Sequence, residues 1–365
     1  MMRESTISSL TLDINVSNVV IVAGTRTPAP SAPPGLLSNE LFAPLMTTTL
    51  LVGIVFSVLG TGANIVTITV YRRLGFADTS NISLTALAVS DVFVSITSLI
   101  SELALLLLIS SIPGIPFTYE IFVPISASAH VCFSRVSALI TAYLSTERYL
   151  CVLLPLKIKS LITPKRTFAV MVVLFVAGFI RWPSDFITFP IRWRHFPSQN
   201  RTLLGALAAT DRTALTLRVF NQIYYVFLLP PLTFSVVVVC TILLSISLHR
   251  SRVWRDANKS VNTASLTDKA HPQQSKEAKA VKMVITIATV FIIATIPSSI
   301  HLIAVNIAPG FDVGGRYVKI WAFTGAIYNI VDCMNCGANV IIYLNMSSKF
   351  RQATLELFSR KGRKK

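Results

Sequence analysis

Residues 137–155 read S-A-L-I-T-A-Y-L-S-T-E-R-Y-L-C-V-L-L-P, an apolar stretch that leads directly into Glu147, Arg148 and Tyr149. Burial of a charged side chain in hydrocarbon is costly, so an acid and a base at the end of a membrane-length apolar run lie at an interface or a functional junction. The stretch therefore predicts a membrane-crossing helix with a functional site at one end.

The composition of the chain is that of an integral membrane protein. Of its 365 residues, 53% are hydrophobic and only 13% are charged, whereas soluble domains carry about 25% charged residues. Apolar runs long enough to cross about 30 Å of hydrocarbon as helices lie at 45–71, 81–109, 119–151, 166–188, 217–248, 278–307 and 317–344. We predict an all-α membrane protein in which residues 45–344 form a bundle of seven transmembrane helices.

The distribution of basic residues predicts the orientation of this bundle. Most of the 33 Lys and Arg residues fall in alternate connections and after the last run, so these segments are expected in the cytosol. The Pro-rich tail 1–44 is then an extracellular, disordered segment and 345–365 is cytosolic. The net charge of +17 is explained by topology and by attraction to anionic lipid, and not by nucleic-acid binding.

Polar side chains interrupt several of the apolar runs. Asp91 and Glu102 are about three helical turns apart in the second run and so share one face. The third run carries a polar stripe at spacings of three and four, which we interpret as an inward-facing functional stripe: His130, Ser134, Ser137, Thr141, Ser145 and Arg148. Arg135 lies beside the stripe and is a second intramembrane base.

Local patterns outside the helix cores predict further features. Apolar residues alternate over 187–193, which favours a short strand or hairpin over the mouth of the bundle. Pro230 and Pro231 predict a kink in the fifth run. Residues 347–358 are amphipathic and predict a short cytosolic helix on the inner leaflet. Asn15 and Asn200 begin glycosylation sequons on the side expected to be extracellular.

Short motifs follow one another along the chain: Gly60 with Asn64, L-A-V-S-D ending at Asp91, Glu147-Arg148-Tyr149, Phe291 with Pro297, N-V-I-I-Y from Asn339 to Tyr343, and Phe350-Arg351. In their order and spacing the chain resembles rhodopsin-class G-protein-coupled receptors over about 45–358. The sequence around Arg148 and Tyr343 is similar to invertebrate peptide and chemosensory receptors, and Thr295 favours the chemosensory side.

The resemblance implies roles for individual residues. Asp91, Ser137, Asn335 and Asn339 match residues that bind a sodium ion in the family. Asn64, Asp91, Phe291 and Pro297 match its activation-related core. Arg148 would meet a heterotrimeric G protein once released from acidic neighbours, and Glu277 matches an acid that pairs with it at rest. The G-protein switch would comprise Glu147, Arg148, Tyr149, Glu277, Asn339 and Tyr343.

The chain also departs from the pattern of the family. The usual external Cys would lie near Val123, so the family's external disulfide is expected to be absent. Thr295 replaces a Trp, Val340 replaces a Pro, and the usual Trp near Leu174 is missing. The fifth run has no Tyr eight residues after its Pro. These differences suggest a divergent branch with altered activation details.

The outer half of the bundle offers candidate ligand-binding residues: Glu102, His130, Arg135, Gln222, Tyr225, Ser298, His301, Tyr328 and Asp332. His130 stands where amine receptors of the family have an Asp, so an aminergic site is not expected. Opsins of the family have a Lys for retinal at about the position of Cys333, so an opsin is not expected either. Arg135 and the basic second loop suggest a ligand, a small molecule or a peptide, with an anionic group. Solvation of the loop charges is an equally acceptable explanation.

Two other functions compete with a plasma-membrane receptor. In a transporter or channel, Asp91, Glu102 and Asp332 would line a permeation path, although this leaves Glu147, Arg148 and Glu277 unexplained. For an enzyme, the sequence offers no metal-ligand set and no nucleophile–base pair. The sequence therefore favours a non-enzymatic receptor, with lipid, an extracellular ligand and a G protein as partners.

Overall fold

The computed structural model describes residues 39–109, 116–118, 121–154, 157–196, 200–206, 208–261, 271–311 and 316–359. Within these ranges, side chains are described from 41 onward, and not at 108, 123, 159, 196, 251–261 and 271–278. Asn15 therefore lies outside the described residues.

The described chain forms helices and one hairpin. The first helices are α2 (Asn39–Leu74), α3 (Thr79–Ile109), the π-helical η2 (Val123–Ala127), α4 (Ser128–Leu153), α5 (Ile158–Leu161), α6 (Pro164–Phe179) and α7 (Arg181–Thr188). The strands are β1 (Ile191–Phe196) and β2 (Arg201–Ala206). The rest are α8 (Arg212–Gln222), the π-helical η4 (Ile223–Leu228), α9 (Leu229–Val261), α10 (His271–Ile307), α11 (Val318–Met346) and α12 (Ser348–Phe358).

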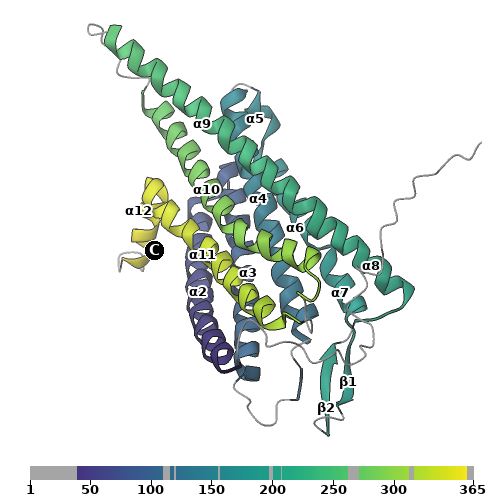
Figure 1. Ribbon diagram of the computed structural model, residues 1–365. Coiled ribbons are helices and arrows are strands. Elements are labelled where there is room, and N and C mark those ends of the chain that lie inside the picture. The colour runs from purple at the N-terminus through teal and green to yellow at the C-terminus, as the bar shows by residue number, and fades with distance from the viewer. Residues whose placement is uncertain are drawn as a thin grey trace, which may run out of the picture.

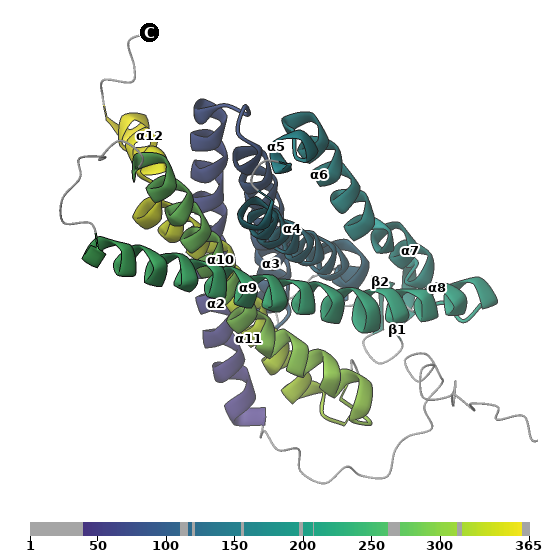
Figure 2. The ribbon, with the colours of Figure 1, turned by 90° about the horizontal axis from the view of Figure 1, so that it is seen from above.

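These elements confirm the predicted seven-span bundle. Among the described residues, seven helical segments are long and apolar enough to cross a membrane. They are Leu41–Leu74, Thr79–Leu107, Pro124–Leu153, Pro164–Thr188, Arg212–Arg250, Lys279–Ile307 and Val318–Met346. Helix α4 contacts α3, α6, α9 and α10 and so lies at the centre of the bundle (Figure 2).

The bundle is apolar on its outside as well as inside. Phe168, Val173 and Ile293 are more than 60% exposed, which suits a helix surface solvated by lipid. In the interior, Tyr71, Ile140 and Tyr343 belong to one buried cluster that joins α2, α4 and α11. Apolar packing in the interior therefore joins these three helices.

Several helix ends carry the side chains that such ends require. Thr163 caps α6 by accepting a hydrogen bond from the Arg166 amide, and Pro164 follows at the first helical position. Asp211 caps α8 and Ser347 caps α12 in the same way. The cap at Ser347 ends the seventh span and starts α12, which confirms the short helix predicted after that span.

The predicted hairpin is present, but it starts later than the alternation suggests, because α7 extends to Thr188. Strands β1 and β2 pair antiparallel from Ile191 with Ala206 to Phe196 with Arg201. Asn200 precedes β2 with a φ of 46°, a left-handed conformation that Asn tolerates. The hairpin lies at the end of the bundle where α2 begins, and α5 and α12 lie toward the opposite end (Figure 1).

The fifth span accommodates its two prolines through a change of helix type. Pro230 and Pro231 lie in the first turn of α9, directly after the π-helical stretch η4. Helix α9 continues from η4 without a break, so each proline removes an amide that a regular helix would bond to the carbonyl four residues before it. The predicted kink stays a prediction, and the feature that the structure has beside the prolines is the π-helical stretch.

Candidate functional site

A cavity of about 600 Å³ opens between α2, α3, α4, α10 and α11. Volumes of about 300–1,000 Å³ are usual for small-molecule sites. Four of the predicted ligand-binding residues line this cavity: Glu102, His130, His301 and Tyr328. Met46, Leu50, Leu105 and Trp321 add apolar and aromatic surface. We refer to this space as the outer cavity.

Glu102 is the buried acid of the outer cavity, with only 3% of its surface exposed. Its Oε2 accepts a 2.9 Å hydrogen bond from Ser57 Oγ. Its Oε1 has no hydrogen-bond partner among the described residues. Gly53 on α2 leaves space for the carboxylate, since a Cβ at that position would lie 2.4 Å from Oε1.

His301 forms the aromatic side of the outer cavity. Its ring centroid lies 5.0 Å from that of Tyr328, 5.5 Å from that of Phe311 and 6.2 Å from that of Trp321. Its Nδ1 is 2.9 Å from Thr324 Oγ1, which fixes the orientation of the imidazole. The cluster joins the end of α10 to the start of α11.

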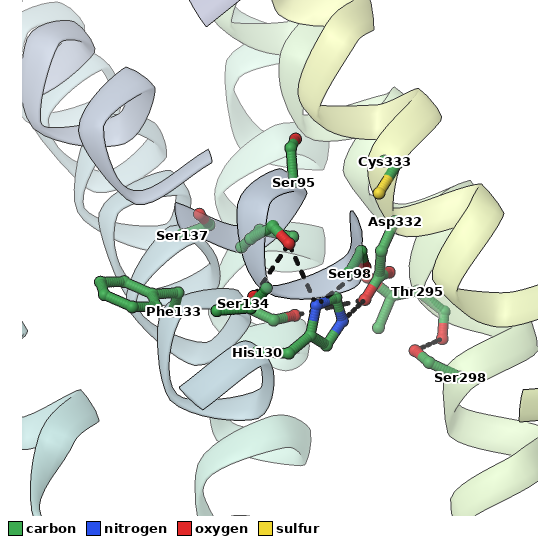
Figure 3. Close-up of polar contacts among 12 residues, drawn as sticks. Ser95, Ser98, His130, Phe133, Ser134, Ser137, Thr295, Ser298, Asp332 and Cys333 are labelled. Carbon is green, nitrogen blue, oxygen red and sulfur yellow. Dashed lines mark hydrogen bonds and ion pairs between the residues drawn. The ribbon is translucent and has the colours of Figure 1, made fainter. Parts of the chain in front are cut away.

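His130 reaches from the outer cavity toward the interior of the bundle (Figure 3). Its Nδ1 lies 3.2 Å from Ser98 Oγ and 3.3 Å from the Val94 carbonyl oxygen. Its Nε2 lies 3.4 Å from Asp332 Oδ2, which also accepts a 3.5 Å hydrogen bond from Ser134 Oγ. These contacts connect α3, α4 and α11.

A smaller cavity of about 30 Å³ lies beyond this contact. About 10–15 Å³ suffices for one water molecule, so the inner cavity holds only a very small occupant. The predicted ligand-binding residues Arg135, Ser298 and Asp332 line this inner cavity and not the outer one. Asp91 lines it as well, so Asp91 and Glu102 share one helix face but open into different cavities.

The residues expected to bind sodium fit that ion in part. Asp91 Oδ1 accepts a 2.7 Å hydrogen bond from Ser137 Oγ, and Oδ2 accepts a 2.9 Å bond from Asn339 Nδ2. Asp91, Ser137 and Asn335 line the inner cavity and offer hard oxygen atoms, which sodium prefers. Asn339 presents its amide nitrogen to Asp91 and would orient the carboxylate.

Two predicted ligand-binding residues of the fifth span line neither cavity. Tyr225 is 1% exposed and donates a 2.7 Å hydrogen bond to the Gly178 carbonyl, so it joins η4 to α6. Gln222 Nε2 donates to Asn306 Oδ1 on α10. Gln222 ends α8 and Tyr225 lies in the π-helical η4, so the two residues lie at a change of helix type.

At the opposite end of α4, Arg148 is held by neighbouring polar groups. Its Nη2 lies 3.2 Å from Glu147 Oε1 and also donates to Ser80 Oγ. Glu147 is 2% exposed and accepts a 2.7 Å hydrogen bond from Thr79 Oγ1. The side chain of Glu277 lies outside the described residues, and Tyr149 is half-buried.

The remaining predicted switch and core residues lie between the spans. Asn64 Nδ2 donates to the Gly60 and Cys336 carbonyls, at 3.0 and 3.1 Å, and so joins α2 to α11. Tyr343 is buried against Tyr71 and Phe350. Phe291 packs in a cluster with Ala138 and Val237, and Pro297 lies inside α10.

Sequence reasoning missed a buried polar cluster around Asp185. Its Oδ2 accepts from Arg181 Nε at 2.8 Å and from Ser128 Oγ, and its Oδ1 accepts from Asn221 Nδ2 at 3.2 Å. The i,i+4 spacing of Arg181 and Asp185 inside an apolar run was the available signal. The cluster ties α7 to α4 and α8 beside the outer cavity.

Comparison with known proteins identifies a family for this arrangement. The family model described as 7 transmembrane receptor (rhodopsin family) matches residues 62–347. A search of curated proteins finds no match to the chain. The family match spans most of the helices that form both cavities and the Arg148 site.

Proposed function

Because this chain belongs to the rhodopsin family of seven-transmembrane receptors, we propose that an extracellular ligand binds its outer cavity and triggers a heterotrimeric G protein at the Arg148 end. Members of the family are multi-pass plasma-membrane receptors that signal through G proteins, and the family is not an enzymatic one. The chain is thus a receptor by family. The ligand, the coupling residues and the orientation below are proposals.

The observation that carries the proposal is the position of Arg148. Its guanidinium contacts both Glu147, its neighbour in the E-R-Y motif, and Ser80 at the start of α3. Contacts of this kind hold the guanidinium at rest, and their loss would free it for a partner. A ligand that favours the released state would shift the equilibrium between the two states.

The contact between His130 and Asp332 supports a route from ligand to switch. His130 lines the outer cavity, and Asp332 lines the inner cavity together with Asp91 and Phe291. A ligand that moves His130 therefore alters the groups around Asp91. We propose that this displacement reaches Arg148 through rearrangement of α10 and α11 around the inner cavity.

We further propose the orientation and the three parts of the chain. Residues 1–44 and the hairpin face the outside, residues 45–344 form the receptor domain, and 345–365 with α12 lie in the cytosol. A chemosensory cue or a peptide is the proposed type of ligand. That the ligand carries an anionic group stays a prediction. Arg135 supports it less than expected, because this side chain lines the inner cavity and not the outer one.

Basal guanine-nucleotide exchange tests the receptor proposal without a ligand. Membranes carrying the wild type, Glu277→Gln and Arg148→Ala would be compared over a panel of G proteins, with Glu356→Gln on α12 as a matched control. We expect Glu277→Gln to raise exchange, Arg148→Ala to abolish it, and Glu356→Gln to match the wild type. Background exchange in all variants at equal surface expression would contradict the proposal and would direct attention to ion and solute flux, as for a transporter or channel.

A further inference from the structure

We propose that the outer cavity binds a ligand with a protonated nitrogen, and that Glu102 is the residue that contacts this nitrogen. The inference rests on the proposed receptor function and adds the charge of the ligand. It differs from the sequence-based expectations of an anionic group and of a site that is not aminergic. It also places the contact on α3 and Glu102, and not on α4 at His130.

The first argument is the incomplete hydrogen bonding of Glu102. Only 3% of the surface of Glu102 is exposed, and Ser57 is its one hydrogen-bond donor among the described residues. A buried carboxylate normally requires several donors or a cation. Oε1 lies against Gly53 and has no donor among the described residues, so a bound cation would supply the missing partner as the carboxylate turns toward the cavity.

The second argument comes from the other charged groups around the outer cavity. Arg181 lines the cavity, but its Nε is bonded to Asp185 at 2.8 Å. His130 lines the cavity as well, but its Nε2 faces Asp332 at 3.4 Å. Arg181 and His130 each lie beside an aspartate. Among the described residues, no base forms an ion pair with Glu102.

The third argument is the aromatic surface that shares the cavity with Glu102. Trp321 and Tyr328 line the same space, and the faces of indole and phenol rings attract cations. The apolar side chains of Met46, Leu50 and Leu105 would cover the hydrocarbon part of such a ligand. A cavity of about 600 Å³ suits a small arylalkylamine, or the basic end of a larger ligand.

The test uses probes that share a shape and differ in charge: 2-phenylethylammonium and larger arylalkylammonium ions, the matching alcohols, and the matching carboxylates. Thermal stabilisation of the purified full-length receptor by each probe, up to millimolar concentrations, gives relative affinities. We expect the ammonium members to bind the wild type most tightly. Glu102→Gln should weaken them by about 10- to 100-fold, because the hydrogen bond to a charged acceptor becomes a neutral one.

Two further variants protect the result from a folding defect. Glu102→Asp keeps the negative charge and should retain part of the ammonium preference, and Glu356→Gln on α12 should retain all of it. Three results would overturn the proposal. The wild type could prefer the alcohols or carboxylates, Glu102→Gln could bind the ammonium probes as tightly as the wild type, or no ammonium probe could stabilise the receptor. Basal nucleotide exchange on the same preparations separates these outcomes from failure of the receptor function, because exchange requires no ligand.

Discussion

Gly53 determines where the carboxylate of Glu102 can lie. The buried backbone of α2 at this residue approaches Oε1 so closely that even a methyl group would meet it. Gly62, nine positions further along the same helix, is exposed, and a Cβ added there would meet no atom within 4 Å. Gly53 is therefore required by the close approach of Glu102, whereas Gly62 only raises the flexibility of α2.

The two glycines provide a matched pair of substitutions. We expect Gly53→Ala to lower the stability of the receptor by about 1–3 kcal/mol, because Glu102 must move out of a packed position. Gly62→Ala should leave stability unchanged or raise it by up to about 1 kcal/mol, since alanine favours the helix. Thermal unfolding of the purified proteins measures both effects, and equal losses from the two changes would contradict this account.

Asp91 carries a second prediction at the scale of a residue. If its carboxylate holds sodium, NaCl should raise the melting temperature above that in choline chloride at equal ionic strength, by about 2–4 °C for each ~1 kcal/mol of binding free energy. Asp91→Asn should abolish the difference. Asp211→Asn, which keeps a good helix cap outside both cavities, should retain it. A full sodium effect in Asp91→Asn would exclude the carboxylate as a ligand.

At the scale of elements, the sequence predicted helices well and their relative contacts poorly. The stripe from His130 to Ser145 is inward-facing as expected, because a regular α-helix keeps spacings of three and four on one face. Tyr225 and Gln222 were expected in the ligand site from their place in the outer half of the fifth span, and in the structure they line neither cavity. The pairing of His130 with Asp332 joins residues distant in the chain, and no local pattern reports such a contact.

Helix α12 offers a prediction at this scale. Phe350 is fully buried, with its ring centroid 5.2 Å from Tyr71 and 5.4 Å from Tyr343, whereas Phe358 is 70% exposed. Phe350→Ala should cost about 3–5 kcal/mol of stability by leaving a cavity. Phe358→Ala should change it by less than about 0.5 kcal/mol. Thermal unfolding in one detergent compares them, and similar losses would show that α12 does not dock through Phe350.

At the scale of the whole molecule, the two sites lie at opposite ends of one central helix. Helix α4 contributes His130 to the outer cavity and Arg148 to the proposed switch. Their separation along the helix is about 27 Å at 1.5 Å per residue. The seven spans and their order could be predicted from hydropathy, and the short helix α12 from the amphipathic pattern of residues 347–358. The division of the polar interior into two cavities depends on side-chain packing between distant helices, which hydropathy does not describe.

The orientation of the bundle can be tested on intact cells. With the hairpin outside, we expect N-glycosidase to increase the gel mobility of the wild type, and Asn15→Gln and Asn200→Gln each to remove one part of that change. Asn200 begins a sequon in the exposed turn before β2. An antibody against a C-terminal tag should bind only after permeabilisation. Binding to unpermeabilised cells would reverse the proposed topology.

The attachment of the hairpin has a consequence for the kinetics of ligand exchange. Strand β2 is joined to residues 116–118 by two main-chain hydrogen bonds, from Thr118 N to Leu204 O at 2.9 Å and from Leu204 N to Pro116 O at 2.8 Å. The five cysteines of the chain all lie in helices and are free thiols. Main-chain hydrogen bonds break and re-form within the fast loop motions of a folded protein, whereas disulfide exchange takes minutes to hours. Entry and departure of a ligand past the hairpin should therefore proceed at the same rates in oxidising and in reducing surroundings.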